Sequence, residues 1–463
     1  MSRSTTGIAL AILACSGCIR ETKDNPISSL NVPPNWHVAT QQAKDDNTYW
    51  AEDLGDANLT SLIRESWANN PDLSAASRRM EVAREEANMA GAKLLPEAGL
   101  ALSGTRSKRN LVGFFPGSNN SFSTESYGLN LNVSWELDLW GKVRDSRKAA
   151  RNAWEASVQD YQAARLSLAG QVSKAWFSAI EANRQVELAE KAENTQSENA
   201  SYISTRFERG LATALEQNLA RATLASTRAG KARRMLQLDL ATRTLETLLG
   251  RHPRGKRWTV IKLPEPKKNP PASPPSQTLE KRPDLLAGKL RLEAAGLDKT
   301  IARKNLLPSL SLVGGPGSRS REFDELLDQQ FRIWSITGNL AQPIFQGGRL
   351  RANVRRAEAA RMAAVDSYKA AALRAFREVE AALSAESLLK EEHDRLEEAA
   401  QASATAADLS WDRYQRGLEG IFATLESRQR AFEAESRLIA LKRERLLNRI
   451  DLHIALGDQA ISD

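Results

Sequence analysis

Residues 127–140 read YGLNLNVSWELDLW, and this stretch decides how the chain is interpreted. Apolar side chains occupy every odd position from Tyr127 to Leu139, and the even positions between them carry Gly, Asn, Ser, Glu and Asp. A period of two is typical of a β-strand with one apolar face and one polar face. In a soluble protein the apolar face of such a strand would lie against a core. The question that the stretch raises is what covers this face.

Most of the remaining chain has apolar residues three or four positions apart, which is typical of amphipathic helices. Val158, Tyr161, Leu168 and Val172 are an example. The alternating strand therefore belongs to a mainly helical chain that contains few strands.

The chain carries the same plan twice. With an offset of 212 residues, PDL at 71–73 matches PDL at 283–285, and LLP at 94–96 matches LLP at 306–308. Beyond the strands the offset becomes 207, so the second copy is five residues shorter between these two groups of matches. The sequence therefore predicts a tandem duplication. Matching residues at the second offset are Gly141 and Gly348, Arg144 and Arg351, Arg206 and Arg413, Gly210 and Gly417, and Leu249 and Leu456.

Each copy begins with a helix that a proline ends, because proline lacks the amide hydrogen and clashes with the preceding turn. A β-hairpin follows, and a glycine then marks the return to two long helices. We expect a first structural repeat over residues 58–250 and a second over residues 283–457. The expected elements are a helix at 73–93, a hairpin at 98–139 and long helices at 142–209 and 213–249, then a helix at 285–305, a hairpin at 309–345 and long helices at 349–416 and 420–456.

The segments outside the repeats have other compositions. Residues 1–17 contain one Arg, a short apolar run and small residues before a cysteine, which predicts a lipoprotein-type signal peptide with Cys18 as the acylated residue. Cys15 is the alternative, and a plain signal cleaved nearby stays open. We expect residues 18–57 to be irregular, residues 251–282 to be a proline-rich extended connection, and residues 458–463 to be a short tail.

The length of the alternating strand suits a membrane. Thirteen positions at ~3.3 Å each make about 43 Å, which crosses about 30 Å of hydrocarbon when the strand is tilted by ~45°. An open four-stranded sheet cannot stand in lipid, because its edge amides would be unpaired. Several copies must therefore share one barrel, and three copies would give about twelve strands, which is wide enough for a passage. Asn130, Asn132, Ser134, Glu136 and Asp138 would then line the water-filled side.

Composition argues against several functional classes. The formal net charge is +8, but acidic and basic residues alternate along the helical segments, which indicates a solvated surface rather than a nucleic-acid site. The four histidines are scattered and form no HExxH pair, and the only cysteines are Cys15 and Cys18. We therefore expect no catalytic site, no metal site, no cofactor and no nucleic-acid partner.

In its sequence motifs the chain resembles the TolC-like outer-membrane efflux proteins, and specifically their lipoprotein branch of the NodT and OprM type. The resemblance covers nearly the whole mature chain, and the order, spacing and duplication of the motifs make it specific. The motifs are NNPDL at 69–73, AKLLP at 92–96, WELDLWGKVR at 135–144, RFERGLATALEQNLARA at 206–222, KRPDL at 281–285, LLPSLSL at 306–312, PIFQGGRLRAN at 343–353, AFREVEAAL at 375–383 and RYQRGLEGIFATLESRQ at 413–429.

The resemblance implies a mainly α-helical protomer with membrane β-strands. Three protomers would form a 12-stranded outer-membrane β-barrel that a long periplasmic α-helical barrel continues. Such a homotrimer is the passive exit duct of a tripartite efflux system. It contacts outer-membrane lipid and is joined through a periplasmic membrane-fusion adaptor to an inner-membrane pump, here expected to be of the RND type.

The resemblance also implies functional residues. The two turns with the family pattern are expected to lie at the periplasmic tip and to dock the adaptor. Acidic residues of the family's closed tip project into the pore, and the matching positions are Glu216 and Glu426, whereas a further acidic position of some relatives is Ala423 here. Arg221, Arg428 and Arg430 are candidate partners for the two glutamates. The docking residues are expected to be Arg206, Phe207, Gly210, Leu211, Arg413, Tyr414, Gly417 and Leu418.

Two alternatives stay open at the level of sequence. The same fold also serves as the outer-membrane duct of type I protein secretion, although a lipoprotein-like start favours drug-type efflux. A soluble periplasmic coiled-coil adaptor or scaffold belongs to a different class, because it would carry one helical hairpin among short β segments rather than two full copies of this plan.

Overall fold

The computed structural model describes residues 32–38, 49–111, 120–256, 258, 262–265 and 274–462. Cys15, Cys18, the expected signal peptide and residues 112–119 of the first hairpin lie outside the described residues. All the helices and strands that follow belong to one contact unit, Pro33–Asp463.

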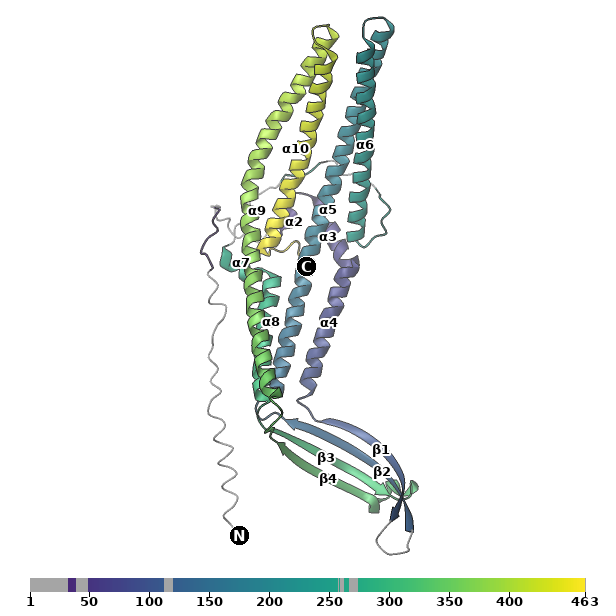
Figure 1. Cartoon of the computed structure of the whole chain (residues 1–463), viewed down its shortest axis with the longest axis vertical. Helices are drawn as coiled ribbons and strands as arrows, with labels where there is room; N and C mark the ends of the chain where they lie inside the picture. Colours follow the sequence, from purple (N-terminus) through teal and green to yellow (C-terminus); the bar gives the residue numbers. More distant parts are fainter. Residues whose placement is uncertain are drawn as a thin grey trace. The chain divides into compact units, whose positions relative to one another are not determined.

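The two halves of the chain have the same order of elements (Figure 1). In each half a helix of 22 residues precedes a β-hairpin, and a helix of 67 residues then leads into a helix of 35 or 36 residues. The first half contains α4 (Pro71–Ala92), β1 (Glu97–Leu111), β2 (Asn120–Leu137), α5 (Lys142–Glu208) and α6 (Ala214–Leu248). The second half contains α8 (Pro283–Lys304), β3 (Ser309–Ser320), β4 (Arg332–Ala341), α9 (Arg349–Gln415) and α10 (Ile421–Leu456).

Several expected boundaries were wrong by a few residues for local reasons. The strand β2 ends at Leu137 rather than at position 139, because the Asp138 carboxylate accepts hydrogen bonds from the Val143 and Arg144 amides (2.9 and 3.0 Å) and so caps the start of α5. The strand β4 ends at Ala341 rather than at position 345, and Pro343 just beyond it has no amide to pair.

Two short helices lie where irregular chain was expected, and a third lies at the start of the expected first repeat. The segment over residues 18–57 contains α2 (Trp50–Asp53), and α3 (Ala57–Asn69) begins at its end. The proline-rich connection ends in α7 (Pro275–Lys281), whose first residue is a proline, and proline is favoured at that position because its missing amide would be unpaired in any case. The composition of the connection therefore concealed a helix. Two 3₁₀ turns, η1 (Asp324–Leu327) and η2 (Gln329–Phe331), join β3 to β4.

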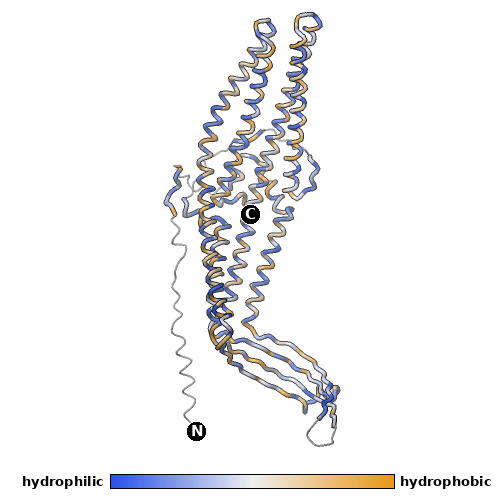
Figure 2. The backbone as a smooth tube through the Cα atoms, viewed as in Figure 1, coloured by the Kyte–Doolittle hydropathy of each residue, from blue (hydrophilic) through white to orange (hydrophobic). Residues whose placement is uncertain are grey.

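The four strands form one antiparallel sheet in the order β1-β2-β3-β4. The pairing aligns the odd positions of β2 with one face of all four strands, and Figure 2 shows the sheet at one end of the long helices. Leu100, Trp334 and Ile336 on that face are 73%, 77% and 74% exposed, so the described chain leaves most of it uncovered. The exception is the end near the β3–β4 connection, where Phe323 packs against Tyr127. The opposite face carries Asn130, Asn132, Ser134, Ser311, Ser335, Thr337 and Asn339.

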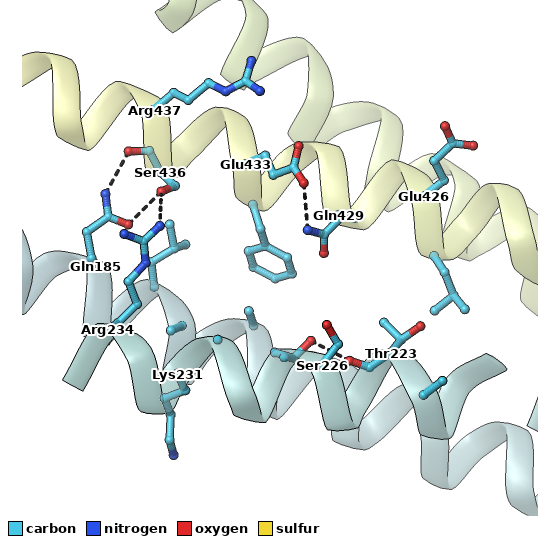
Figure 3. A pocket seen from close by; sticks show the side chains of 18 of the residues that line it. Gln185, Thr223, Ser226, Lys231, Arg234, Glu426, Gln429, Glu433, Ser436 and Arg437 are labelled. Atoms are coloured by element: carbon cyan, nitrogen blue, oxygen red, sulfur yellow. Dashed lines mark hydrogen bonds between the residues drawn. The ribbon is translucent and has the colours of Figure 1, made fainter. Parts of the chain in front are cut away.

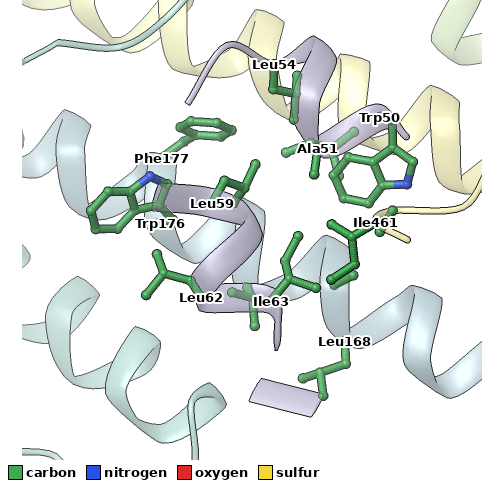
Figure 4. Close-up of a cluster of buried hydrophobic side chains, with 14 of the residues drawn as sticks. Trp50, Ala51, Leu54, Leu59, Leu62, Ile63, Leu168, Trp176, Phe177 and Ile461 are labelled. Atoms are coloured by element: carbon green, nitrogen blue, oxygen red, sulfur yellow. The ribbon is translucent and has the colours of Figure 1, made fainter. Parts of the chain in front are cut away.

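The principal core lies midway along the helices, where α2 and α3 pack on α5, α6 and α10 (Figure 4). Trp50, Trp176 and Phe177 are its largest buried side chains. The Trp176 indole donates a hydrogen bond to Asp56 (2.7 Å), which is also the N-cap of α3. The C-terminal segment joins this core, because the Trp50 and Ala51 amides bond to the Gln459 and Ala460 carbonyls and Ile461 is buried.

Helices of the described residues are each too polar or too short to cross a bilayer.

Candidate functional site at the helical tips

The α5–α6 hairpin and the α9–α10 hairpin each end in the same type of turn. Both turns lie at the end of the long helices that is opposite to the sheet (Figure 1). Gly210 and Gly417 have φ angles of 72° and 74°, a left-handed conformation that costs glycine little. In the first turn the Leu211 amide bonds to the Arg206 carbonyl (2.8 Å) and the Gly210 amide to the Phe207 carbonyl (2.9 Å). This pair of bonds is the Schellman motif that ends helices.

The second turn repeats the first bond for bond. The Leu418 amide bonds to the Arg413 carbonyl (2.9 Å), and the Gly417 amide bonds to the Tyr414 carbonyl (3.0 Å). The Arg413 side chain also donates to the Leu418 carbonyl (3.4 Å), as Arg206 does to the Leu211 carbonyl (3.3 Å). The residues expected at the tips therefore build the turns, and this local role is compatible with docking.

Glu216 has a defined structural role at the first tip. The Thr213 hydroxyl accepts a hydrogen bond from the Glu216 amide (3.2 Å), and the Glu216 carboxylate accepts one from the Thr213 amide (2.6 Å). This reciprocal arrangement is a capping box at the start of α6. The carboxylate is therefore held at the tip by the backbone of its own helix.

The start of α10 has no equivalent box. Gly420 takes the place of Thr213 and Ala423 that of Glu216, so the helix begins without a side-chain cap. Glu426 lies further along α10, where it is exposed and paired with Arg430 at 2.5 Å. Arg221, Arg428 and Arg430 were the expected basic partners of the two glutamates. Among the described residues, only Arg430 forms such an ion pair, and its partner is Glu426.

Equivalent aromatic residues at the two tips have different surroundings. Phe207 is 38% exposed, whereas Tyr414 is 3% exposed. Tyr414 belongs to a cluster of residues from all four long helices, with its ring centroid 5.7 Å from that of Trp411. The Arg206 guanidinium lies 5.4 Å from the Tyr414 ring, so the cluster ties the two hairpins together. The side chain of Tyr414 therefore lies inside the tip of this chain, and its part in docking stays a prediction.

Burial also changes the electrostatics of this cluster. Burial raises the pKa of the Tyr414 hydroxyl, and the negative charge of Glu216 raises the pKa further. Among the described residues the hydroxyl has no hydrogen-bond partner. Burial likewise lowers the pKa of the Arg428 guanidinium, which stacks 4.5 Å from the Trp411 ring. Sequence reasoning missed Tyr202, Trp411 and the stacking of Arg428, although aromatic residues a turn or so from each tip were a visible signal.

The tips expose apolar side chains that the turn geometry does not require. Leu211, Leu215, Leu418 and Phe422 are 64%, 68%, 62% and 69% exposed. Exposed apolar residues gathered at one place are typical of interaction surfaces.

A groove lies between the hairpins behind the tips (Figure 3). It has a volume of about 970 Å³ and is lined by α5, α6 and α10. At its far end the Gln185 side chain donates to the Ser436 carbonyl (2.9 Å), and the Ser436 hydroxyl donates to Gln185 (2.8 Å). Arg234 also donates to that hydroxyl (3.3 Å), so α5, α6 and α10 are joined where the groove ends. In the described part of the chain no three His, Cys, Asp or Glu residues are arranged to bind a metal ion.

Comparison with known proteins identifies the class. The family model described as "Outer membrane efflux protein" matches residues 62–251 and 275–458. The chain is 32% identical to outer membrane protein OprJ of Pseudomonas aeruginosa, over 97% of this chain and 94% of that protein. A crystal structure of a membrane protein from Pseudomonas aeruginosa superposes with a TM-score of 0.86 at 31% identity, covering 93% of this chain and 98% of that one. The CmeC outer membrane channel of Campylobacter jejuni gives 0.85 at 26% identity, with 92% of each chain covered.

The chain belongs to the outer membrane efflux protein family. It is an outer-membrane channel that serves as the exit duct of a tripartite efflux system, and it extends from the outer membrane into the periplasm. The family consists of channels rather than enzymes, and the matches are to outer-membrane channels rather than to soluble periplasmic adaptors.

Proposed function

We propose that three copies of this chain close one passage through the outer membrane and pass small molecules outward without a reaction of their own. The observation that carries the proposal is the four-stranded sheet, in which β1 and β4 each have one unpaired edge and one face is exposed and apolar. Edge amides cannot be left unpaired in hydrocarbon. Copies joined edge to edge satisfy them, and three copies leave Asn130, Asn132 and Ser134 on the water-filled side.

We further propose that both tips dock a periplasmic membrane-fusion adaptor, which connects the duct to an inner-membrane pump of the RND type. Leu211 and Leu418 support the proposal because they are exposed at equivalent places on the two turns. Phe207 adds an exposed aromatic ring at the first tip. Arg206, Gly210, Arg413 and Gly417 shape the two turns, and Tyr414 supports the second tip from inside.

Glu216 and Glu426 are proposed to guard the pore at this end. A threefold arrangement would place three copies of each carboxylate around the axis, where like charges attract cations into a narrow opening. The exposure of Glu426 and the position of Glu216 in the first turn of α6 support this role.

The N-terminus is proposed to anchor the duct in lipid. Residues 1–17 would be removed as a signal peptide and Cys18 would be acylated, with Cys15 as the alternative. Residues 58–250 and 283–457 would then be the two duplicated repeats of the mature chain, which agrees with the two separate family matches.

The docking proposal is tested by changing the exposed leucines in cells that depend on this duct. Leu211→Asp and Leu418→Asp together should reduce drug efflux at least tenfold and reduce co-purification of the cognate adaptor, because a charged side chain replaces the apolar contact. The matched control Leu211→Met with Leu418→Met keeps an apolar surface and should keep efflux. Normal efflux by the aspartate variant, at equal amounts in the outer membrane, would remove the tips from the docking surface.

A further inference from the structure

The segments that lead from each β-hairpin into the long helices are rich in positive charge. Residues 349–356 read RLRANVRR and contain four arginines and no acidic residue. Residues 142–151 read KVRDSRKAAR and contain five basic residues and one acidic residue, Asp145, which pairs with Lys304 of α8 at 2.6 Å. Both segments begin where the sheet meets the helices (Figure 1), so this level of the molecule has a local excess of cations.

One side of α5 continues the polar face of the sheet. Lys142 pairs with Glu136 at 2.5 Å, and Glu136 occupies an even position of β2, on the polar face. Ser146 is one turn after Lys142 and lies on the same side of the helix. Arg144 is two positions from both of these residues, and two positions turn a helix by about 200°. Arg144, and Lys148 one turn after it, therefore lie on the opposite side of α5, which continues the apolar face of the sheet.

The same arrangement recurs in α9. Arg351 and Arg355 match Arg144 and Lys148 at the offset of 207 residues, and the members of each pair are one helical turn apart. The helices α5 and α9 follow β2 and β4 in the same way, so matching residues lie on matching sides. Both halves of the chain thus place cations next to the sheet, on the side that continues its apolar face.

The helix α8 adds a further cation on this side. Glu358 of α9 is three positions after Arg355 and on the same side, and it pairs with Lys299 of α8. Arg303 follows Lys299 by one turn and is exposed. The exposed cations on this side are named here the basic collar, which consists of Arg144, Lys148, Arg151, Arg303, Arg351 and Arg355.

Most of the basic collar has no acidic partner. Arg144 pairs with Asp138 and Arg151 pairs with Glu155, and both arginine side chains are still 66% exposed. Within the described residues the other four members of the collar form no ion pair. Uncompensated cations gathered at one level attract an anion from outside the chain.

The basic collar lies at the depth of lipid headgroups. Trp140, Ile344 and Phe345 are exposed where the sheet meets the helices, and aromatic residues are typical of this boundary of a membrane. The headgroup layer on each side of the hydrocarbon is about 5–8 Å thick. Lys148 lies about 6 Å along the helix from Arg144, and long cationic side chains can extend toward phosphates. The sequence of an apolar face, aromatic residues and then cations follows the layers of a bilayer.

We propose that the basic collar binds the phosphates of anionic phospholipids in the periplasmic leaflet of the outer membrane. Clusters of Lys and Arg beside a membrane-spanning segment attract lipids of net negative charge, and guanidinium groups bind phosphate oxygens in pairs. Bound headgroups fix the height at which the channel stands in the membrane. The inference rests on the outer-membrane location of the sheet and requires neither a particular number of copies nor an adaptor.

The proposal is tested on the full-length chain by competition between two lipids. The protein is reconstituted into vesicles of equal parts phosphatidylglycerol, which is anionic, and phosphatidylcholine, which is zwitterionic, and is then extracted in mild detergent. Mass spectrometry gives the ratio of the two lipids that stay bound. The parent protein should retain phosphatidylglycerol over phosphatidylcholine at least fivefold at about 0.15 M salt, and the ratio should approach one at about 1 M salt because salt screens the attraction.

Two sets of substitutions locate the site. K148Q/R303Q/R351Q/R355Q removes the four unpaired cations of the collar and should lower the retained ratio to near one. R303K/R351K/R355K keeps the charges and should keep most of the preference, so a loss of folding can be distinguished from a loss of charge.

A matched control removes the same charge elsewhere. R233Q/R374Q/R377Q/K390Q replaces four exposed cations further along α6 and α9 and should keep the preference of the parent. Equal loss in the two glutamine variants would show an effect of net charge alone and would overturn the collar.

Two further results would also overturn the proposal: equal retention of both lipids by the parent protein, or an unchanged ratio after K148Q/R303Q/R351Q/R355Q. These results would leave the channel intact. A parent chain that enters vesicles of neither lipid would instead contradict the membrane location of the sheet.

Discussion

The first and second helical tips have the same turn but opposite surroundings. Gly210 and Gly417 have the same left-handed conformation, and each is followed by an exposed leucine. Beside them, however, Phe207 is exposed and its counterpart Tyr414 is buried among the four long helices. The first tip also has a capping box that the second lacks.

The comparison shows that the two copies of the plan share the turn, whereas the residues beside it, Phe207 and Tyr414, have different surroundings. The backbone pattern of a Schellman turn needs little more than a glycine and a helix end, so it tolerates changes around it. The first tip can offer an aromatic ring to a partner, whereas the second uses its ring to hold the hairpins together. Variants at equivalent positions should therefore have unequal effects.

The largest difference should come from truncating the two aromatic residues. Tyr414→Ala removes a buried ring, and such losses cost about 3–5 kcal/mol, so amides near the tip should exchange with deuterium much faster. Phe207→Ala removes a half-exposed ring and should leave exchange nearly unchanged while weakening adaptor binding. Equal exchange in the two variants would contradict the proposed division of roles.

Replacing the turn glycines should have the next largest effect. Gly210→Val and Gly417→Val each force a β-branched residue into a left-handed conformation at a cost of about 1–2 kcal/mol, which should distort the turn. We expect efflux to be lost while trimers persist in the outer membrane. Gly230→Val, at an α6 glycine where an added Cβ would meet no other atom within 4 Å, is a control for general loss of fold. Full drug resistance with either turn variant would show that the turn is dispensable.

Separate roles of Glu216 can be resolved by two substitutions. Glu216→Ala removes both the cap and the charge, and should destabilise the start of α6 by roughly 0.5–1 kcal/mol. Glu216→Gln keeps a side chain that can cap the helix but removes the charge. If the carboxylate guards the pore, both variants should change cation selectivity in single-channel recordings, and only the alanine variant should loosen the tip. A change confined to Glu216→Ala would reduce the residue to a cap.

Glu426→Gln should have the smallest effect on stability, because exposed helix ion pairs such as that with Arg430 contribute only about 0.3–0.5 kcal/mol. The expected result is a modest loss of cation preference in the closed-state conductance. Arg430→Gln removes the positive charge that pairs with Glu426, and it should therefore strengthen the cation preference. Identical conductance in all three proteins would reject Glu426 as a gate residue.

Sequence alone predicted the long helices and the hairpins because their signals are local and repeated. Apolar spacing, the prolines after α4 and α8, and the glycines before α5 and α9 each act within a few residues. The short helices α2 and α3 were missed because they are stabilised by the core around Trp50 and Trp176 and not by their own pattern. The helix α7 was missed because its seven residues follow a proline-rich segment and are too few to show a helical period. The burial of Tyr414 could not be predicted either, because it depends on residues from four helices.

The central claim is that copies of this chain must join to close the open sheet, and the mass of the purified protein in detergent tests it most directly. The chain has a mass of 51.0 kDa. Light scattering after size exclusion, corrected for bound detergent, should give a protein mass about three times that of one chain. A protein mass equal to one chain, with efflux function intact in cells, would contradict the account.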